Sequence, residues 1–468
     1  MLRTPFSPRL WLMSRRSLSS SPPHDVKRPR LVGLTPDDYR NGVMLAPMVR
    51  SGALPTRLFA LKHGAKLVWG PEMVDKAILH AERVVDSVSG TISYNGKQER
   101  AMFTCHPIEK PYLIFQVGSA DPNLAVQASR VVMNDVSGIE LNCGCPKPFS
   151  THAGMGAALL TNPDLLCSIL SALRRDLPPH ISVSAKIRLL PAQEDTLSLV
   201  ERIVNTGINC LTIHCRTRNM RPREHALIHR LREIVDFVKG LGRDVAVIEN
   251  GDCVGFKDAQ RIRAITGADS VMIATAAEAN PTIFSPSPLT SIEDGFILSY
   301  LRLCKYLDNH WASTKFCVSQ FKDSKSSNKA LRAAVIKAKG YSDLGALVGP
   351  WTGSDEFASI KAAIDARTTT PPFSLPADES TPSPPEEDTT TTPSGWRGNP
   401  DPAVVYEAPL LPANECRLMV PAGVSRQDPG TPTPITFSTA VPLFLSLSDA
   451  PGLNKSWAGV ASCSGTRW

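Results

Sequence analysis

The stretch Gly138-Ile139-Glu140-Leu141-Asn142-Cys143-Gly144-Cys145-Pro146 shows the pattern that decides the fold: a short, mostly apolar run that ends in polar residues and glycine. Similar runs recur, each followed by a segment with helical periodicity. Continuously apolar runs are typical of strands buried on both faces, as in parallel sheets. The repetition therefore predicts an α/β fold with one (β/α)8 TIM barrel rather than two open sheets. The eight predicted strands are Val43–Ala46, Leu67–Trp69, Tyr112–Val117, Gly138–Leu141, Val183–Ile187, Leu211–His214, Val245–Glu249 and Ser270–Ile273.

Composition divides the 468-residue chain into four segments. Residues 1–30 form a basic, Ser- and Arg-rich leader, and residues 31–287 contain the predicted barrel with an extra hairpin near Ser93–Gly96. Residues 288–350 predict a small all-helical domain with a positive face, which suits nucleic acid. Residues 351–468 include 17 prolines and predict a disordered tail, apart from a short helix at Phe357–Arg367.

The leader does not decide in which cellular compartment the protein acts. Its arginines and serines, with Asp25 as the first acid, are typical of a mitochondrial transit peptide. The alternatives are a disordered basic arm, or an upstream extension of a chain whose synthesis starts at Met13. We expect a cytoplasmic protein with mitochondrial targeting as the alternative. No run approaches the ~18 apolar residues of a membrane span, which excludes an integral membrane protein.

The eleven cysteines are scattered along the chain, and only Cys143 and Cys145 lie close together. A disulfide framework or a structural zinc site needs clustered thiols, and no Cys-x-x-Cys pair occurs. We therefore expect reduced thiols and no metal site.

Polar or small residues follow each of the eight predicted strands, at the face where barrel enzymes place their active sites. One such residue alone would be an ordinary polar cap on a strand end. Eight of eight indicate a shared pocket. These residues are Pro47, Met48, Glu72, Gln116, Asn142 to Cys145, Lys186, Arg188, His214, Arg216, Asn250 to Asp252, Ala274 and Thr275.

The loops after the last two strands have the small residues that a phosphate site needs. Flavin mononucleotide (FMN) suits such a pocket, because Gln116 and Lys186 can hydrogen-bond the pyrimidine edge of its ring and stabilise the reduced form. Composition alone leaves other phosphorylated ligands open. Gly144 and Pro146 present Cys145 at a turn, as an acid or a nucleophile, whereas Cys143 is expected to be a buried thiol. Four arginines within residues 216–223 suit an RNA backbone; the alternative is a solvated loop.

These residues together resemble the tRNA-dihydrouridine synthases, and within that family the eukaryotic class that reduces uridine 20 of the D-loop. The resemblance covers roughly residues 41–345 and is closest to fungal-type members, because residues 351–468 show no pattern of a double-stranded-RNA-binding domain. The motifs that carry it are Leu45–Arg50, Gln116–Gly118, Asn142–Lys147, Gly154–Leu160, Lys186–Arg188, His214–Pro222, Asn250–Asp252 and Asn280-Pro281.

The resemblance implies a flavin-dependent oxidoreductase. The reduced FMN, charged by NADPH or NADH, would give hydride to C6 of uracil while Cys145 protonates C5. Asn142, Lys147 and Arg188, with Arg216, would bind the substrate. The helical domain would grip the tRNA elbow while the base is extracted, and a monomer is expected. The residues that would hold FMN are Pro47, Met48, Val49, Gln116, Lys186, His214, Asn250, Gly251, Asp252, Ala274 and Thr275.

Two other functions remain open on the residues alone. The first is a flavin barrel that reduces a free pyrimidine or a small enone. The second is an RNA-binding relative that has lost catalysis, for which the only hint is Thr275, where the family usually has Arg near the flavin phosphate. A steep loss of binding with salt would favour an RNA substrate over a small one.

Overall fold

The computed structural model describes residues 33–97, 101–221, 223–289, 291–322, 330–349, 353–368 and residue 374. The predicted leader, 1–30, lies outside the described residues, as does the predicted tail except for residues 353–368 and residue 374. The chain divides into two units, residues 1–386 and 387–468, and all the described residues belong to the first.

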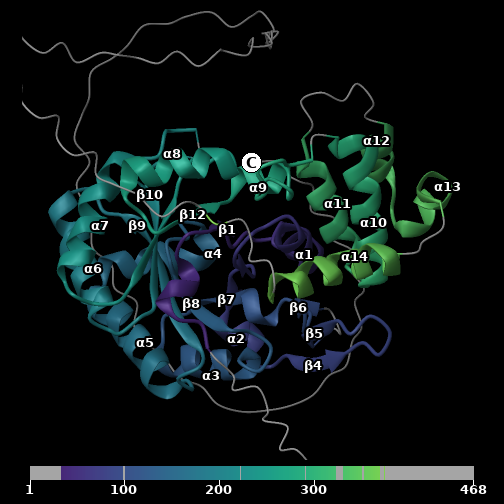
Figure 1. Ribbon diagram of the computed structural model, residues 1–468. Helices are drawn as coiled ribbons and strands as arrows, with labels where there is room; N and C mark the ends of the chain where they lie inside the picture. Colours follow the sequence, from purple (N-terminus) through teal and green to yellow (C-terminus); the bar gives the residue numbers. More distant parts are fainter. Residues whose placement is uncertain are drawn as a thin grey trace, which may run out of the picture. The chain divides into compact units, whose positions relative to one another are not determined.

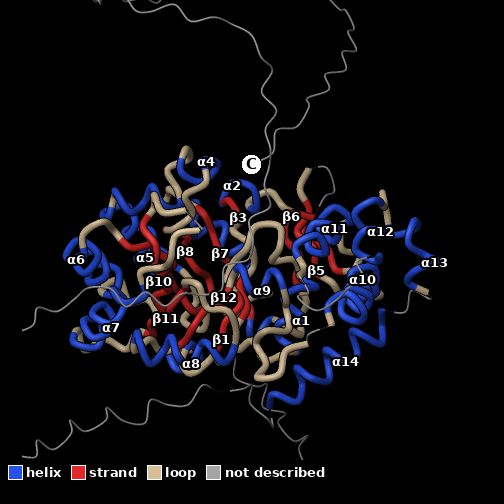
Figure 2. The backbone as a smooth tube through the Cα atoms, turned by 90° about the horizontal axis from the view of Figure 1, so that it is seen from above, coloured by secondary structure: helices blue, strands red, loops and turns tan. Residues whose placement is uncertain are grey.

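Eight parallel strands form a closed barrel in the described part of the chain, which confirms the predicted fold class (Figures 1 and 2). Neighbouring strands follow the order β2-β1-β12-β11-β10-β9-β8-β7, and pairing of β2 with β7 closes the ring. The barrel strands are β1 (Val43–Leu45), β2 (Val68–Trp69), β7 (Leu113–Gly118), β8 (Gly138–Cys143), β9 (Ser182–Leu189), β10 (Cys210–Thr217), β11 (Ala246–Asn250) and β12 (Ser270–Ile273).

The second barrel position is interrupted. After β2 the chain leaves the ladder at Gly70 and returns as β3 (Met73–Val74), which pairs with the far end of β7. Glu72 therefore sits in a break of the barrel wall, where its side chain is not fixed by strand alternation.

Successive side chains on each strand alternate between the barrel interior and the surrounding helices. One buried cluster fills the barrel interior. Its members include Met44, Trp69, Ile114, Ile248 and Met272. The larger cluster joins the outer strand faces to the helices. The helices around the barrel are α1 (Leu54–Lys62), α3 (Pro122–Val132), α5 (Pro163–Asp176), α6 (Gln193–Val204), α7 (Leu231–Gly240) and α8 (Phe256–Thr266), with shorter α2 (Asp75–Ile78), α4 (Pro148–Thr151) and α9 (Thr275–Ala279).

An antiparallel three-stranded sheet is inserted between β3 and β7. It consists of β4 (Glu82–Val85), β5 (Ile92–Asn95) and β6 (Ala101–Cys105), paired in the order β4-β5-β6. The hairpin expected near Ser93–Gly96 is therefore the centre of a larger element. In Figure 1 this sheet lies on the same side of the barrel as the C-terminal helices.

The helical region is α10 (Ile297–Tyr306), α11 (Trp311–Gln320), α12 (Ala330–Lys337), α13 (Gly345–Val348) and α14 (Gly353–Asp365). Helix α14 lies beyond the predicted boundary at residue 350, so the predicted disordered tail begins too early. The reason is that Ile360 and Ile364 are buried as α14 packs against α10 and α1. The predicted short helix at Phe357–Arg367 corresponds to this element.

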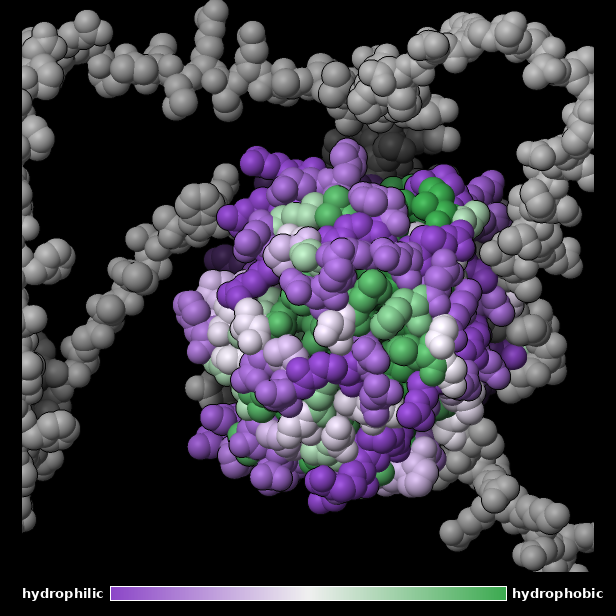
Figure 3. Space-filling view, turned by 90° about the vertical axis from the view of Figure 1, so that its left-hand side faces the viewer, coloured by the Kyte–Doolittle hydropathy of each residue, from purple (hydrophilic) through white to green (hydrophobic). Residues whose placement is uncertain are grey.

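The described surface is mixed in polarity. On the face shown in Figure 3, hydrophobic residues reach the surface in the middle and hydrophilic residues surround them. Within the described residues, no helix is both long and apolar enough to span a bilayer. All nine described cysteines are free thiols.

Candidate active site

Inward-facing polar residues meet at the C-terminal ends of the barrel strands. Asn142 on β8 pairs in register with Lys186 on β9, and His214 on β10 pairs with Asn250 on β11. On the other side, Gln116 on β7 pairs with Glu140, two residues before Asn142. The structure thus brings together five neighbouring strands at the predicted face of the barrel.

A chain of hydrogen bonds orders one half of this layer. Gln116 Nε2 donates to Glu140 Oε1 at 2.8 Å, and Asn142 Nδ2 donates to Gln116 Oε1 at 3.0 Å. The backbone N–H groups of Gly144 and Cys145 each donate to Asn142 Oδ1 at 2.9 Å. These bonds fix the orientation of both amides and connect them to the turn that carries Cys145.

Charge is concentrated in the other half. Burial lowers the pKa of Lys186, and the neighbouring Glu140 carboxylate opposes that shift. Burial also raises the pKa of Glu140, with Lys186 opposing. The pKa of His214 is lowered, first by burial and then by Lys186, Arg188 and other cations, so His214 is a neutral imidazole at neutral pH.

Cys145 lies on the turn that follows β8 and is partly exposed, whereas Cys143 is fully buried, as expected. The Cys145 carbonyl accepts the N–H of Ala157 at 2.9 Å, which ties the turn to the following loop. Burial and the charge of Glu72 raise the pKa of the Cys145 thiol to about 11. At neutral pH this side chain is therefore a thiol, able to give a proton but not poised as a thiolate nucleophile.

Glu72 is a functional candidate that the sequence placed at the barrel mouth but to which it assigned no role. Its side chain is buried, Oε1 accepts a hydrogen bond from the Ser150 hydroxyl at 3.0 Å, and its carboxylate interacts with the Cys145 thiol. Burial raises the pKa of Glu72, and these two interactions oppose the shift. The sequence indicates its position, because Glu72 follows a predicted strand. It does not indicate its contacts, because Cys145 and Ser150 lie more than 70 residues away in the chain.

The residues predicted for a phosphate lie at the ends of β11 and β12. Asn250 is buried, and its Nδ2 donates to the Met272 carbonyl at 2.9 Å, which joins the two strand ends. Gly251 is buried, and Thr275 is exposed at the start of α9. Asp252 has a positive φ of 59° and binds the neighbouring loop, with its Oδ2 accepting the Ala226 N–H at 2.7 Å.

The residues after β1 border the same mouth. Pro47 and Met48 are half-buried, and Met48 packs against both buried clusters. Val49 is 50% exposed, so its side chain is available to a ligand. Ala274, after β12, is half-buried beside the interior cluster.

The predicted substrate-binding cations differ in their surroundings. Arg188 reaches across two loops, with Nε donating to the Gly144 carbonyl at 2.8 Å and a terminal nitrogen to the Thr217 carbonyl at 3.0 Å. Lys147 is exposed at the start of α4. Arg216 is buried: it pairs with Asp252 and donates to the Glu224 carbonyl at 2.7 Å.

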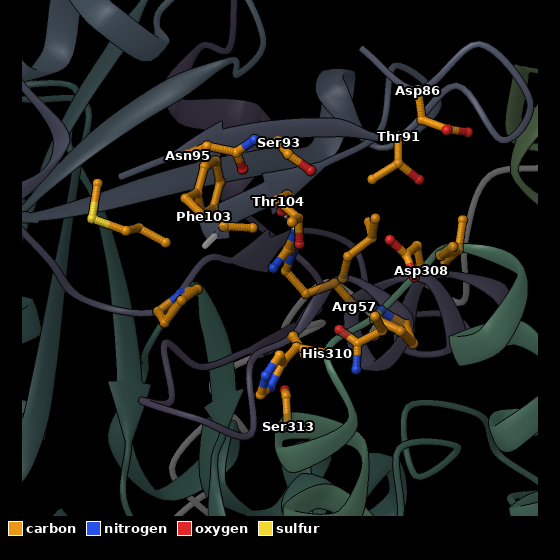
Figure 4. Close-up of a pocket in the computed structure, with 18 of the residues that line it drawn as sticks. Arg57, Asp86, Thr91, Ser93, Asn95, Phe103, Thr104, Asp308, His310 and Ser313 are labelled. Atoms are coloured by element: carbon orange, nitrogen blue, oxygen red, sulfur yellow. Dashed lines mark hydrogen bonds between the residues drawn. The ribbon is translucent and has the colours of Figure 1, made fainter. Parts of the chain in front are cut away.

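A groove of about 960 Å³ leads away from this mouth. Val49, Arg50 and Glu72 line its barrel end, and its walls come from the inserted sheet and the helical region. Figure 4 shows Thr91, Ser93 and Asn95 on one side and Asp308, His310 and Ser313 on the other. The groove therefore connects the surroundings of Cys145 to an open channel lined by hydroxyl and amide groups together with acidic and basic side chains.

The family model for dihydrouridine synthase (Dus) matches residues 44–344, which include the whole barrel and much of the helical region. The chain belongs to the dihydrouridine synthase family. It is 47% identical over 314 residues to a Schizosaccharomyces pombe protein and 42% identical over 305 residues to a Saccharomyces cerevisiae protein, both named tRNA-dihydrouridine(20) synthase. The first match covers 66% of this chain and 64% of that relative, and the second covers 62% and 79%.

A second S. cerevisiae relative, named tRNA-dihydrouridine(20a/20b) synthase, is 30% identical over 241 residues, which is 51% of this chain and 60% of that relative. As in the first comparison, the match spans less than two thirds of the relative's length. Every site residue predicted from the sequence lies within the segment that matches the dihydrouridine synthase family.

The geometry also limits two predictions. Arg216 was expected to bind substrate and Asp252 to bind the cofactor, yet each is engaged by the other. In the helical region, Arg302 lies 3.5 Å from Glu356 and Arg332 pairs with Glu293, so part of the expected positive charge is half-buried and paired with carboxylates. Among the described residues, no group of three or more His, Cys, Asp or Glu side chains could hold a metal ion.

Proposed function

We propose that this chain is a tRNA-dihydrouridine(20) synthase: it reduces the C5=C6 bond of a D-loop uridine, using FMN and NADPH or NADH. The observation that carries the proposal is the position of Cys145, on a turn that Asn142 holds beside the polar layer of the barrel mouth. The names of the relatives that are 42% and 47% identical support the same reaction and position.

The polar layer fits the pyrimidine edge of a flavin. Lys186 is half-buried at the mouth, where its ammonium interacts with the Glu140 carboxylate and can donate hydrogen bonds to a ligand. Gln116 and the neutral His214 border the same space. A cation beside N1 and O2 of the ring would stabilise the negative charge of the reduced flavin. Pro47, Met48 and Val49 would flank the ring.

The phosphate would bind at the ends of β11 and β12. Asn250 and Gly251 supply the turn, and the backbone of Ala274 and Thr275 lies beside it. Thr275 brings a hydroxyl and no charge to this end. Because Asp252 binds Arg216 and Ala226, its side chain is assigned to holding the turn and not to contacting the cofactor.

FMN, when bound and reduced by NAD(P)H, supplies hydride to C6 of the uracil. The chain supplies the proton: Cys145 donates it to C5 from the other side of the base, where negative charge develops as the ring is reduced. Asn142 holds the turn, and Lys147 and Arg188 are placed to orient the base and its carbonyl groups.

The groove supports a large substrate over a small one. An enzyme that takes a free pyrimidine needs no open channel of about 960 Å³ beside its acid. A D-loop uridine must be extracted from the folded tRNA, and the flanking nucleotides then need a path to follow. Hydroxyl and amide groups such as Ser93, Asn95 and Ser313 can hydrogen-bond the RNA backbone and its 2′-hydroxyls.

The test uses purified protein with FMN, NADPH and an unmodified tRNA transcript, and the dihydrouridine is mapped by position. We expect product at position 20 and none in a transcript with cytidine there. Activity on free uridine or a small enone, with none on tRNA, would overturn the proposal in favour of the small-molecule reductase. Salt-dependent tRNA binding without reduction at any position would identify a catalytically inactive relative.

We propose that the protein acts in the cytoplasm. The alternative is import into mitochondria, directed by the leader at residues 1–30, which lies outside the described residues. Dihydrouridine measured separately in cytosolic and mitochondrial tRNA from cells that lack the gene decides between them. Loss in the mitochondrial fraction would assign a transit peptide to residues 1–30. A monomer is the proposed oligomeric state, which sedimentation at equilibrium would test.

A further inference from the structure

We propose that Glu72 is a positioning residue for Cys145: together with Ser150 it fixes the thiol at the barrel mouth and keeps it protonated. The inference rests on the proposed function, because it explains how the proton donor of that reaction stays loaded. Its test below reads the thiol directly, so it can fail or succeed independently of the substrate.

Three segments that are distant in sequence build this group. Glu72 comes from the break between β2 and β3, Cys145 from the turn after β8, and Ser150 from α4. Ser150 is fully buried, and its hydroxyl donates to Glu72 Oε1 at 3.0 Å. The Cys145 thiol interacts with both side chains. Glu72 Oε2 is buried and makes no hydrogen bond within the described residues, so it can accept one from the thiol.

Two glycines leave room for the group. A Cβ atom on Gly118 would lie 2.8 Å from Glu72 Oε1. A Cβ atom on Gly156, which has a φ of +58°, would lie 2.6 Å from the Cys145 carbonyl oxygen and 3.1 Å from Cys145 Cβ. Larger residues at either position would displace the carboxylate or the turn. The backbone around the group is therefore shaped to hold these side chains in contact.

The electrostatic need for Glu72 comes from the cations that face the thiol. Lys186 and Arg188 on β9 interact electrostatically with Cys145, and the backbone N–H of Lys147 also lowers the pKa of its thiol. Each of these favours a thiolate, which cannot donate a proton. Burial and the negative charge of Glu72 act in the opposite direction. Glu72 is the only carboxylate among the main influences on the pKa of Cys145.

This arrangement also closes the proton balance of the proposed step. The proton on Cys145 goes to C5, which leaves a thiolate beside the Glu72 carboxylate. Two neighbouring negative charges repel, so the thiolate takes up a proton from solvent and the thiol is restored. Glu72 itself contacts neither the base nor the flavin in this scheme.

The experiment measures the rate of Cys145 alkylation by iodoacetamide against pH in flavin-loaded protein, followed by mass spectrometry of the peptide that contains Cys145. Only the thiolate reacts, so the midpoint of the profile reports its ionisation. In Glu72→Gln we expect the midpoint to fall by ~1–3 pH units, the range for removal of a like charge in contact. Asp75→Asn is the matched control, because Asp75 is a buried carboxylate that binds a serine, Ser119, at 2.6 Å.

An unchanged midpoint in Glu72→Gln, or an equal fall in Asp75→Asn, would overturn the inference. If Glu72→Gln does not fold, Glu72→Asp serves instead: it moves the charge away from the thiol by one methylene and should lower the midpoint by a smaller amount. In tRNA assays, Glu72→Gln should lose more activity at pH 9 than at pH 7 while flavin content stays constant. Absence of product with wild-type protein would instead reject the proposed function, whatever the alkylation profile shows.

Discussion

Asn142 and Gln116 are joined by a hydrogen bond of 3.0 Å, and the free end of the Asn142 amide holds the turn that carries Cys145. One side chain thus links Gln116, the proposed flavin contact on β7, to Cys145, the proposed proton donor after β8. This link would keep the two groups at a constant relative position.

Replacement of Asn142 should separate these two roles. Asn142→Asp keeps an acceptor for the N–H groups of Gly144 and Cys145 but loses the donor to Gln116, so flavin affinity should fall about tenfold, as expected for one lost buried hydrogen bond. Asn142→Ala loses both, and its single-turnover rate should fall about a hundredfold or more. Flavin fluorescence titration and rapid-quench assays measure the two effects. Equal flavin affinity in Asn142→Asp and wild type would contradict the assignment.

Removal of the Cys145 thiol should abolish proton transfer without emptying the site. Cys145→Ala should keep the yellow flavin and bind tRNA normally, and dihydrouridine formation should fall by ~10²–10⁴. Cys143→Ala is the matched control two residues away, because Cys143 is buried and points away from the barrel interior. Near-normal product from Cys145→Ala would remove Cys145 from the mechanism.

The pH dependence of wild-type activity should reflect a thiol that is harder to ionise than usual. Burial and Glu72 raise the pKa of Cys145 to about 11, and an acid must be protonated to act. Activity that depends on this proton is therefore fully present well below that value and is lost as the pH rises through it. We expect single-turnover rates to be constant between pH 7 and 9. A decline centred near pH 8.5, the ordinary thiol range, would show that the thiol is not held in this way.

The sequence predicted the barrel well because continuous apolar runs and helical periodicity are local signals. It also predicted which residues reach the mouth, since the carboxyl ends of parallel strands share one face. It placed Glu72 at the mouth but assigned it no role, because the role of that carboxylate depends on Ser150 and Cys145, which only folding brings near. Sequence reasoning also could not see that Arg216 meets Asp252, 36 residues away. In both cases the sequence showed which residue types are present but not which side chains they contact in the folded protein.

The pairing of Arg216 with Asp252 predicts a structural and not an RNA-binding role. Arg216→Met should lower the midpoint of thermal unfolding. We expect the free energy of unfolding to fall by ~1–3 kcal/mol, because Arg216 is buried while Asp252 is partly exposed. The affinity of the folded fraction for tRNA should stay within about twofold of wild type. Arg218→Met, at an exposed position just after β10, is the control and should leave stability unchanged. A selective loss of tRNA affinity in Arg216→Met would return this residue to the substrate site.

Helix α14 should be part of the folded enzyme and not of a dispensable tail. Ile360 is fully buried where α14 packs against α10 and α1. Beyond the helix, Arg367 donates a hydrogen bond to the Ala65 carbonyl at 2.9 Å. Its guanidinium also lies 4.8 Å from the centre of the Tyr112 ring. Ile360→Ala should therefore cost ~2–5 kcal/mol of stability, and Ile360→Val ~0.5–1.5 kcal/mol. Truncation after residue 350 should destabilise the protein at least as much as Ile360→Ala, because it removes every one of these contacts. Urea unfolding measures the free energy of unfolding of the full-length protein, both variants and the truncated chain, and so ranks their stabilities. A truncated chain as stable as the full-length protein would show that α14 adds nothing to the fold, and would restore the boundary that composition places at residue 350.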